Sequence, residues 1–218
     1  KPDIVINAAA YTAVDNAEKN PTISYKVNSE ALENIACILE KSGVYLIHFS
    51  TDYVFNGRKK YPYLETDQPC PINVYGKSKL SGEEKIEANM QNYFILRTSW
   101  VIGTKGNNFI SKILLLAKNS DKIKVVRDQF GVPTSTKLIS KVVEEILVDI
   151  KRKKSFIPGI YNLAPKGKTN WFEIASIAIE LADKKNFPFK KHRPEIIPIM
   201  TYEYPFLAER PINSLLDT

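Results

Sequence analysis

The sequence predicts an α/β protein in which helices cover a parallel sheet. Short apolar runs typical of strands alternate with stretches whose apolar residues follow helical spacing. The chain has 218 residues, 44% of them apolar and 25% charged, which is typical of a globular protein large enough for a full core. Glycines and prolines punctuate the segments between these patterns.

In the first half of the chain, strand and helix patterns alternate in the order that a parallel sheet requires. The predicted strands are residues 4–6, 44–49 and 93–97. The predicted helices are residues 21–42 and 74–89, and Gly43 is a natural stop for the first of them. A loop rich in proline separates the second strand from the second helix, and it contains Asn56-Gly57.

After Trp100 the pattern loosens, and we place the boundary between the sheet core and a second region there. The predicted helices are residues 108–118, 137–151 and 170–184. The predicted strands are residues 123–126 and 160–163. Residues 187–218 are rich in proline and predict no closing helix. We expect some of these later elements to be interleaved with the core sheet.

Several classes of protein are excluded by composition. No apolar stretch approaches the roughly 20 residues that span a bilayer, and the first residues lack the order of a secretory signal. We therefore expect a cytoplasmic protein with no membrane partner. Cys37 and Cys70 are the only cysteines, so neither a disulfide framework nor a Cys-rich metal site is predicted.

The formal net charge of +7 suits a nucleic acid or an anionic small substrate such as a nucleotide-sugar. The sign of the charge alone does not separate these two ligands. The basic residues lack the interleaved aromatic residues and the recognised modules that nucleic-acid binding proteins carry. We therefore expect no nucleic-acid partner.

Tyr75 and Lys79 stand four residues apart in the predicted helix 74–89, so they share one face. The hydroxyls of Ser50 and Thr51 follow the strand 44–49, at the edge where open α/β sheets bind ligands. A Tyr phenol can protonate a carbonyl oxygen, and a nearby ammonium lowers the pKa of that phenol. The pattern predicts carbonyl reduction by a nicotinamide cofactor; the alternative is a surface Tyr beside a solvated Lys.

Several short segments strengthen this interpretation because they occur together and in one order. They are NAAAYTAVD at 7–15, STDYVF at 50–55, VYGKSK at 74–79, RTSW at 97–100, GNNF at 106–109, DQFGVPT at 128–134 and RPINS at 210–214. Over nearly its whole length the chain resembles the dTDP-4-dehydrorhamnose reductase family of the extended short-chain dehydrogenase/reductases. The resemblance implies a Rossmann-like doubly wound parallel sheet with a smaller substrate-binding C-terminal region.

The resemblance also implies an activity, the reduction of the carbon-4 ketone of dTDP-4-dehydro-L-rhamnose by NADPH or NADH. This reaction serves dTDP-rhamnose and cell-surface polysaccharide biosynthesis. Tyr75 matches the proton donor, Lys79 the residue that lowers its pKa and holds the nicotinamide ribose, and Thr51 the hydrogen-bond partner of the reacting oxygen. Asn28 matches the Asn that supports a proton-relay water, although it could equally be a helix-surface amide.

Further residues match binding positions of the family. Those implied for the cofactor are Ala9, Ala10, Tyr11, Thr12, Phe49, Tyr75 and Lys79. Those implied for the nucleotide-sugar are Thr51, Asp52, Trp100, Asn108 and Arg210. Asn108 and Arg210 are suggested because a diphosphate suits a helix N-terminus and a guanidinium. Trp100 could instead be a core aromatic, and Arg210 could instead brace the C-terminal loop.

By this resemblance, residues 1–99 are the remaining part of a dinucleotide-binding domain and residues 100–218 are mainly the substrate-binding region. The family's first strand and glycine-rich phosphate loop do not occur in these residues, and we expect a longer chain. The choice between NADH and NADPH is left open for the same reason. Lys137 stands where a magnesium-binding Glu is expected, so no metal site is predicted. Whether a homodimer forms is also left open.

Two alternatives remain at this stage. A non-catalytic regulatory relative could keep the fold, although it would not need Thr51, Tyr75 and Lys79 together. A sugar-nucleotide epimerase or dehydratase is the other alternative, since dehydratases typically carry acidic residues after the strand-end Thr. Asp52 fits that pattern loosely, whereas the residues that follow it fit the reductase better.

Overall fold

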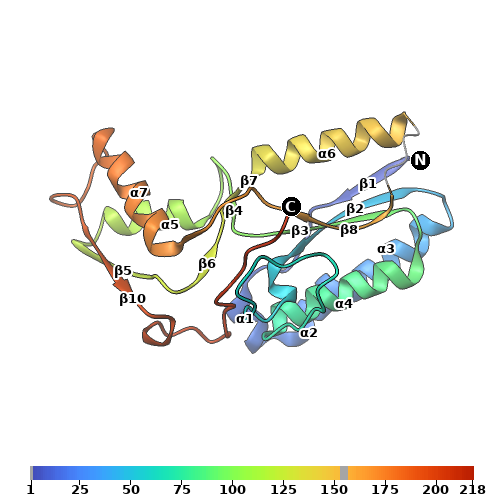
Figure 1. The fold of residues 1–218 in the computed structure, drawn as a ribbon, viewed down its shortest axis with the longest axis horizontal. Helices are drawn as coiled ribbons and strands as arrows, with labels where there is room; N and C mark the ends of the chain where they lie inside the picture. The colour runs from blue at the N-terminus through green and yellow to red at the C-terminus, as the bar shows by residue number, and fades with distance from the viewer. Residues whose placement is uncertain (1, 153–156) are drawn as a thin grey trace.

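The structure, a computed structural model, describes residues 2–152 and 157–218. A parallel sheet covered by helices occupies one end of the molecule, and a smaller group of helices and strands occupies the other (Figure 1). The α/β fold with a parallel sheet is confirmed. Within the described part of the chain, every helix is too short or too polar to cross a membrane.

The main sheet consists of four parallel strands. In spatial order they are β1 (Ile4–Asn7), β2 (Tyr45–Thr51), β3 (Tyr93–Thr98) and β8 (Gly159–Leu163). Thr51 pairs with Thr98 in register, and Thr98 pairs with Leu163. The carboxyl ends of β2, β3 and β8 therefore meet at one edge of the sheet, where the chain leaves toward its loops.

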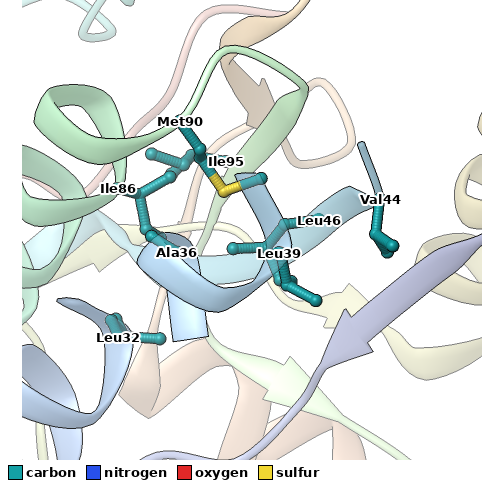
Figure 2. Packing of buried hydrophobic residues seen from close by; sticks show 8 residues of the cluster. All are labelled: Leu32, Ala36, Leu39, Val44, Leu46, Ile86, Met90 and Ile95. Atoms are coloured by element: carbon teal, nitrogen blue, oxygen red, sulfur yellow. The ribbon is translucent and has the colours of Figure 1, made fainter. Parts of the chain in front are cut away.

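Helices α3 (Ala31–Glu40) and α4 (Val74–Asn89) cover one face of this sheet (Figure 1). The buried cluster between them and the strands consists of Leu32, Ala36, Leu39, Val44, Leu46, Ile86, Met90 and Ile95 (Figure 2). A fully buried side chain of this size contributes roughly 1.5–3 kcal/mol by leaving water. The packing of α3 on α4 therefore fixes α4 firmly against the sheet.

Helix α6 (Thr136–Lys151) covers the opposite face (Figure 1). Its Val143 and Ile146 pack against Ile47, Phe94 and Leu96 of the sheet. Because successive side chains of a strand point to opposite faces, β2 and β3 must be apolar at consecutive positions. This requirement explains the unbroken apolar runs in the sequence. Both α6 and β8 follow Trp100 in the chain, so late elements complete the core sheet.

The second group is built around two parallel strands, β5 (Lys122–Val126) and β10 (Glu195–Ile199). Helices α5 (Phe109–Ala117) and α7 (Trp171–Lys184) share a buried cluster with them. Two short pairs connect the groups. They are β4 (Val101–Ile102) with β7 (Thr134–Ser135), and β6 (Phe130–Gly131) with β9 (Thr169–Asn170).

Besides the two-residue strands β4, β6, β7 and β9, which were not predicted, three longer elements differ from the sequence prediction. Residues 21–42 are not one helix: α2 (Pro21–Tyr25) leads into a π-helical turn, Lys26–Glu30, before α3 begins. Helix α1 (Val14–Lys19) was not predicted, because six residues with one buried side chain show no clear periodicity. Strand β10 was missed because it contains Pro198, which an edge strand tolerates.

The π-helical turn lies against α4 at a point where no side chain fits. A Cβ atom on Gly82 would stand 2.0 Å from the backbone oxygen of Asn28 and 2.6 Å from Leu32. A glycine at position 82 therefore lets the two backbones touch. Through this contact α4 packs against both the π-helical turn, Lys26–Glu30, and α2.

We predict that Gly82→Ala lowers the free energy of unfolding by about 1–3 kcal/mol, the usual effect of overpacking a tight contact. The added methyl group must displace the backbone at Asn28. Chemical denaturation measures the loss, and Glu84→Ala, at an exposed position of the same helix, is the control. Equal stability of Gly82→Ala and the unaltered protein would contradict the tight contact.

Candidate active site

A cavity of about 500 Å³ opens at the carboxyl edge of the main sheet. The predicted site residues that line it are Ala9, Ala10, Thr12, Phe49, Thr51, Asp52, Tyr75, Lys79 and Trp100. They come from the segment after β1, the end of β2, the first turns of α4 and the segment after β3. The fold therefore gathers residues that are far apart in the sequence around one cavity.

The start of α4 is fixed against the end of β2. The Asn73 side chain caps the helix by accepting a hydrogen bond from the Gly76 N–H at 2.8 Å. A Cβ atom on Gly76 would lie 2.2 Å from the backbone oxygen of Tyr53, so the helix approaches this turn as closely as a glycine allows. Tyr75, in the same first turn, is thereby placed beside Thr51.

Tyr75 is buried, and burial raises the pKa of its phenol to about 12. An interaction with the Thr51 hydroxyl opposes this rise, and the Asp52 carboxylate adds to it. Desolvation of the phenolate is the largest cause of this rise. That Lys79 lowers the pKa of Tyr75 stays a prediction.

Lys79 is 1% exposed, and its nitrogen is held from β2. Nζ donates a hydrogen bond to the Phe49 carbonyl at 2.7 Å and lies 2.9 Å from Nε2 of His48. Burial lowers the pKa of Lys79 to about 8, although the charge of Glu83 opposes this shift. Glu83 itself forms a buried ion pair with Arg97, with 2.6 Å between Oε2 and Nη2.

Asp52 is the acidic group of the cavity. Its Oδ1 accepts a hydrogen bond from the Thr51 hydroxyl at 2.9 Å, whereas Oδ2 is buried and has no partner among the described residues. Burial raises the pKa of this carboxyl from an ordinary 3.8 to about 6, despite hydrogen bonds from Ser214 and Thr51. Asp52 therefore exchanges its proton close to neutral pH.

Trp100 and Trp171 line the same cavity. Their rings stack with centroids 3.7 Å apart and planes 18° apart. Trp100 has a positive φ of 46°, and its ring lies over Gly131, where a Cβ atom would be 2.5 Å away. The sequence analysis missed Trp171, because the two tryptophans are 71 positions apart and nothing local connects them.

Asn28 and Tyr11 lie beside the cavity but do not line it. The Asn28 amide accepts from the Tyr11 N–H at 2.8 Å and donates to the Tyr11 carbonyl at 3.0 Å. It also donates to the Ser78 hydroxyl at 3.0 Å. Asn28 is 1% exposed, so the alternative of a helix-surface amide is wrong: it ties the segment after β1 to α4.

Asn108 lies outside this cavity, at the start of α5 in the second group. Its side chain accepts a hydrogen bond from the Ser111 N–H and donates to the Gly103 carbonyl, which makes it part of a capping box. It lines a different hollow, of about 410 Å³, together with Lys137. The structure therefore separates Asn108 from the catalytic set.

Arg210 lines a larger cavity, of about 940 Å³, next to the first. Its guanidinium lies 5.9 Å from the Tyr53 ring, which lines the smaller cavity. Nη2 bonds Asp15 at 2.7 Å, while Nη1 is buried without a partner in the part of the chain that the structure describes. Basic side chains recur around this cavity, namely Arg58, Lys59, Lys60 and Lys168.

Among the residues that the structure describes, no group of three or more His, Cys, Asp or Glu is suited to hold a metal ion.

We predict that Asp52→Asn stabilises the protein by up to about 3 kcal/mol at about pH 8 and has little effect at about pH 4. The native carboxyl binds its proton more tightly than the unfolded one, so stability falls as pH rises between these two pKa values. Above that window the buried charge costs its full amount. Urea denaturation at both pH values measures the difference, and an equal gain at both would contradict a charge effect.

Comparison with known proteins places the chain among enzymes. Dehydrorhamnose reductases of two bacteria are close in sequence. The dTDP-4-dehydrorhamnose reductase of Escherichia coli K12 is 40% identical over 218 residues, which is 100% of this chain and 72% of that protein. The one from Burkholderia thailandensis is 41% identical over 221 residues, covering 99% of this chain and 74% of that protein.

A solved structure agrees with the sequence matches. The dTDP-4-dehydrorhamnose reductase of Bacillus anthracis, crystallised in complex with NADP, superposes with a TM-score of 0.89 at 34% identity. The match covers 99% of this chain and 72% of that one. The family model described as the RmlD substrate binding domain matches residues 1–218. The chain therefore belongs to the RmlD substrate binding domain family, among the dTDP-4-dehydrorhamnose reductases.

Proposed function

We propose that this protein reduces the carbon-4 ketone of dTDP-4-dehydro-L-rhamnose to dTDP-L-rhamnose with NADPH or NADH, in the synthesis of cell-surface polysaccharide. One observation carries the assignment of residues. Thr51, Tyr75 and Lys79 lie on one wall of a cavity at the carboxyl edge of a parallel sheet. The activity follows from about 40% identity to the reductases over the full length of this chain.

The residues of the smaller cavity fit the nicotinamide and ribose end of such a cofactor. Ala9 and Ala10 offer little bulk where a flat ring must approach, and Lys79 offers donors to ribose hydroxyls. Two buried hydroxyls at this edge, Ser50 and Thr98, have no hydrogen-bond partner among the described residues. Unpartnered buried polar atoms favour a polar ligand, because such atoms are otherwise costly.

Reduced nicotinamide, when bound, supplies the hydride. In our proposal Tyr75 gives the proton to the carbon-4 oxygen. Because burial raises its pKa, the phenol stays protonated at neutral pH until charge develops on the substrate oxygen. The Tyr53 N–H places the oxygen of Thr51, and the single hydroxyl proton, donated to Asp52 in this structure, turns to the substrate oxygen in our proposal. Lys79 holds the ribose from the same wall.

The substrate is proposed to span the two cavities. Asp52 and Trp100 line the smaller one, where the sugar must lie to reach Tyr75. The diphosphate then lies near Arg210, whose buried Nη1 is a free donor at the larger, basic cavity. Asn108 stays a prediction for the diphosphate, although its amide already caps α5. Asn28 supports the site indirectly, through Tyr11.

Several broader expectations stay proposals. Residues 1–99 are proposed to hold the dinucleotide, and residues 100–218 mainly the nucleotide-sugar. We propose a cytoplasmic enzyme without nucleic-acid or membrane partners, and a homodimer remains a prediction from the family resemblance. The basic character of the larger cavity favours the anionic substrate as the reason for the net charge of +7.

We predict that Tyr75→Phe lowers kcat by about 10²–10⁴-fold, the usual contribution of a positioned proton donor. A coupled assay on the full-length protein follows cofactor absorbance with the native sugar nucleotide. Tyr53→Phe is the matched control, because this ring lies edge-on to Tyr75 in the same cavity and is expected to keep the activity. Wild-type turnover by Tyr75→Phe would exclude Tyr75 as the proton donor.

The same assay tests the reaction itself. A reductase consumes one cofactor per product, whereas an epimerase returns its cofactor to the starting state. Absence of turnover by the full-length protein with the native sugar nucleotide would contradict the proposed function.

We predict that Arg210→Ala raises KM for the sugar nucleotide by about 10–100-fold while kcat changes little, since a hydrogen bond between charged groups contributes equally to substrate and transition state. Asp15→Asn is the control. This change removes the negative charge that pairs with Arg210 and alters the side chain that accepts from the Leu207 N–H, but it keeps the Arg210 side chain itself. A rise in KM of the same size in both variants would mean that Arg210 only braces the C-terminal segment.

A further inference from the structure

His48 is a polar side chain between two apolar residues of a strand, Ile47 and Phe49. It lies in β2, is 1% exposed and does not line either of the two cavities described above. Burial holds the pKa of its imidazole well below the ordinary range, and any positive charge on Lys79 lowers that pKa further. A buried, neutral histidine in a strand core needs hydrogen-bond partners at both ring nitrogens.

One ring nitrogen of His48 contacts the neighbouring strand. Asn7 of β1 is directly opposite in register, and its Nδ2 donates to Nδ1 of His48 at 3.1 Å. The orientation of the Asn7 amide is set by its other end, because Oδ1 accepts from the Ala9 N–H at 3.0 Å. Nδ1 of His48 is therefore the acceptor, and the ring proton is on Nε2.

The other ring nitrogen faces Lys79. Nε2 lies 2.9 Å from Nζ, and the second partner of Nζ is the Phe49 carbonyl at 2.7 Å, one residue along the same strand. A lysine side chain has four rotatable bonds and does not hold its nitrogen in place by itself. The ring of His48 and the carbonyl of Phe49, on adjacent residues of β2, together hold the Lys79 nitrogen in place.

We propose that His48 is a positioning residue for Lys79, and that its Nε2 holds the lysine nitrogen at the wall of the catalytic cavity. The inference rests on the proposed function and deepens it. It extends the catalytic set inward by a chain of contacts, from Lys79 through His48 to Asn7. Because Asn7 also holds the Ala9 N–H, the chain connects Lys79 to the segment beside the cofactor.

The hydrogen positions have a chemical consequence. An Nε2–H can donate only to the neutral amine of Lys79, because an ammonium has no lone pair. This contact therefore opposes protonation of the lysine and acts in the same direction as burial, which lowers the pKa of Lys79 to about 8. The other charged or titratable groups near Lys79 are Glu83 on the same helix, paired with Arg97 of β3, and Tyr75 and Asp52 at the cavity. None of these is altered by a change at position 48. Removing the Nε2 contact should therefore raise the pKa of Lys79.

Two substitutions separate the two contacts of the imidazole. His48→Gln places a polar atom near the Nε2 position and loses the one at Nδ1, whereas His48→Asn does the reverse. We expect His48→Asn to lower kcat by about 10-fold, the effect of one lost hydrogen bond, with KM for the sugar nucleotide within about 2-fold. We expect His48→Gln to keep kcat within about 3-fold.

Thermal unfolding of both variants shows whether each folds and how much stability it loses. A merely structural histidine would make kcat follow stability, and His48→Asn, which keeps the contact to Asn7, would then be the more active variant. That order, or equal activity of the two variants, would overturn the proposal. Turnover by the unaltered protein in the same assay separates a failure of this inference from a failure of the proposed function.

A second readout does not depend on turnover. NMR titration of the lysine side chains follows the pKa of Lys79, with Lys79→Arg used for assignment. The midpoint is expected to rise by about 0.5 units or more in His48→Asn and to stay closer to the unaltered protein in His48→Gln. An unchanged midpoint in both variants would contradict the proposed contact.

Discussion

The site depends on the close approach of α4 to the carboxyl edge of the sheet. Gly76 touches the backbone at Tyr53, and Gly82 touches the backbone at Asn28. These two contacts, six residues apart, seat the helix directly on the backbone of the two segments it packs against. Tyr75 and Lys79 lie at and between the two contacts, so their positions are set by backbone packing before any ligand binds.

Burial then sets the charge state of the site. It raises the pKa of Tyr75 to about 12 and that of Asp52 to about 6, and it lowers the pKa of Lys79 to about 8. All three shifts favour the neutral form of the group, because the charged form loses its hydration. Tyr75 therefore keeps its phenolic proton at neutral pH, which is the form that the proposed proton donor needs.

The sequence predicted the parts of the fold and site whose signals are local. The strand runs, the helix of α4 and the four-residue spacing of Tyr75 and Lys79 each follow from a short stretch of residues, and their placement agreed with the structure. The π-helical turn could not be predicted from local spacing, and its close contact with Gly82 is more than 50 positions away in the sequence. The partner of Asn28 and the stacking of Trp171 are long-range in the same way.

The pKa of Tyr75 shows a different limit. Spacing places Lys79 on the same face of the helix, but only the structure shows that β2 engages its nitrogen. A sequence pattern identifies which charges are near one another, whereas the balance between attraction and desolvation depends on distances and depth. The direction in which the pKa of Tyr75 shifts therefore follows from its burial, which only the structure shows.

The pairing of β3 with β8 has a consequence for the order in which the molecule assembles. Thr98 and Leu163 are partners in the sheet, yet the whole chain from Trp100 through α6 lies between them. During synthesis from the N-terminus, the edge of β3 stays unpaired until β8 has emerged, and the apolar face under α6 stays bare for almost as long. The sheet and the region inserted into it are therefore expected to gain their stability together, in one cooperative step rather than as two independent domains.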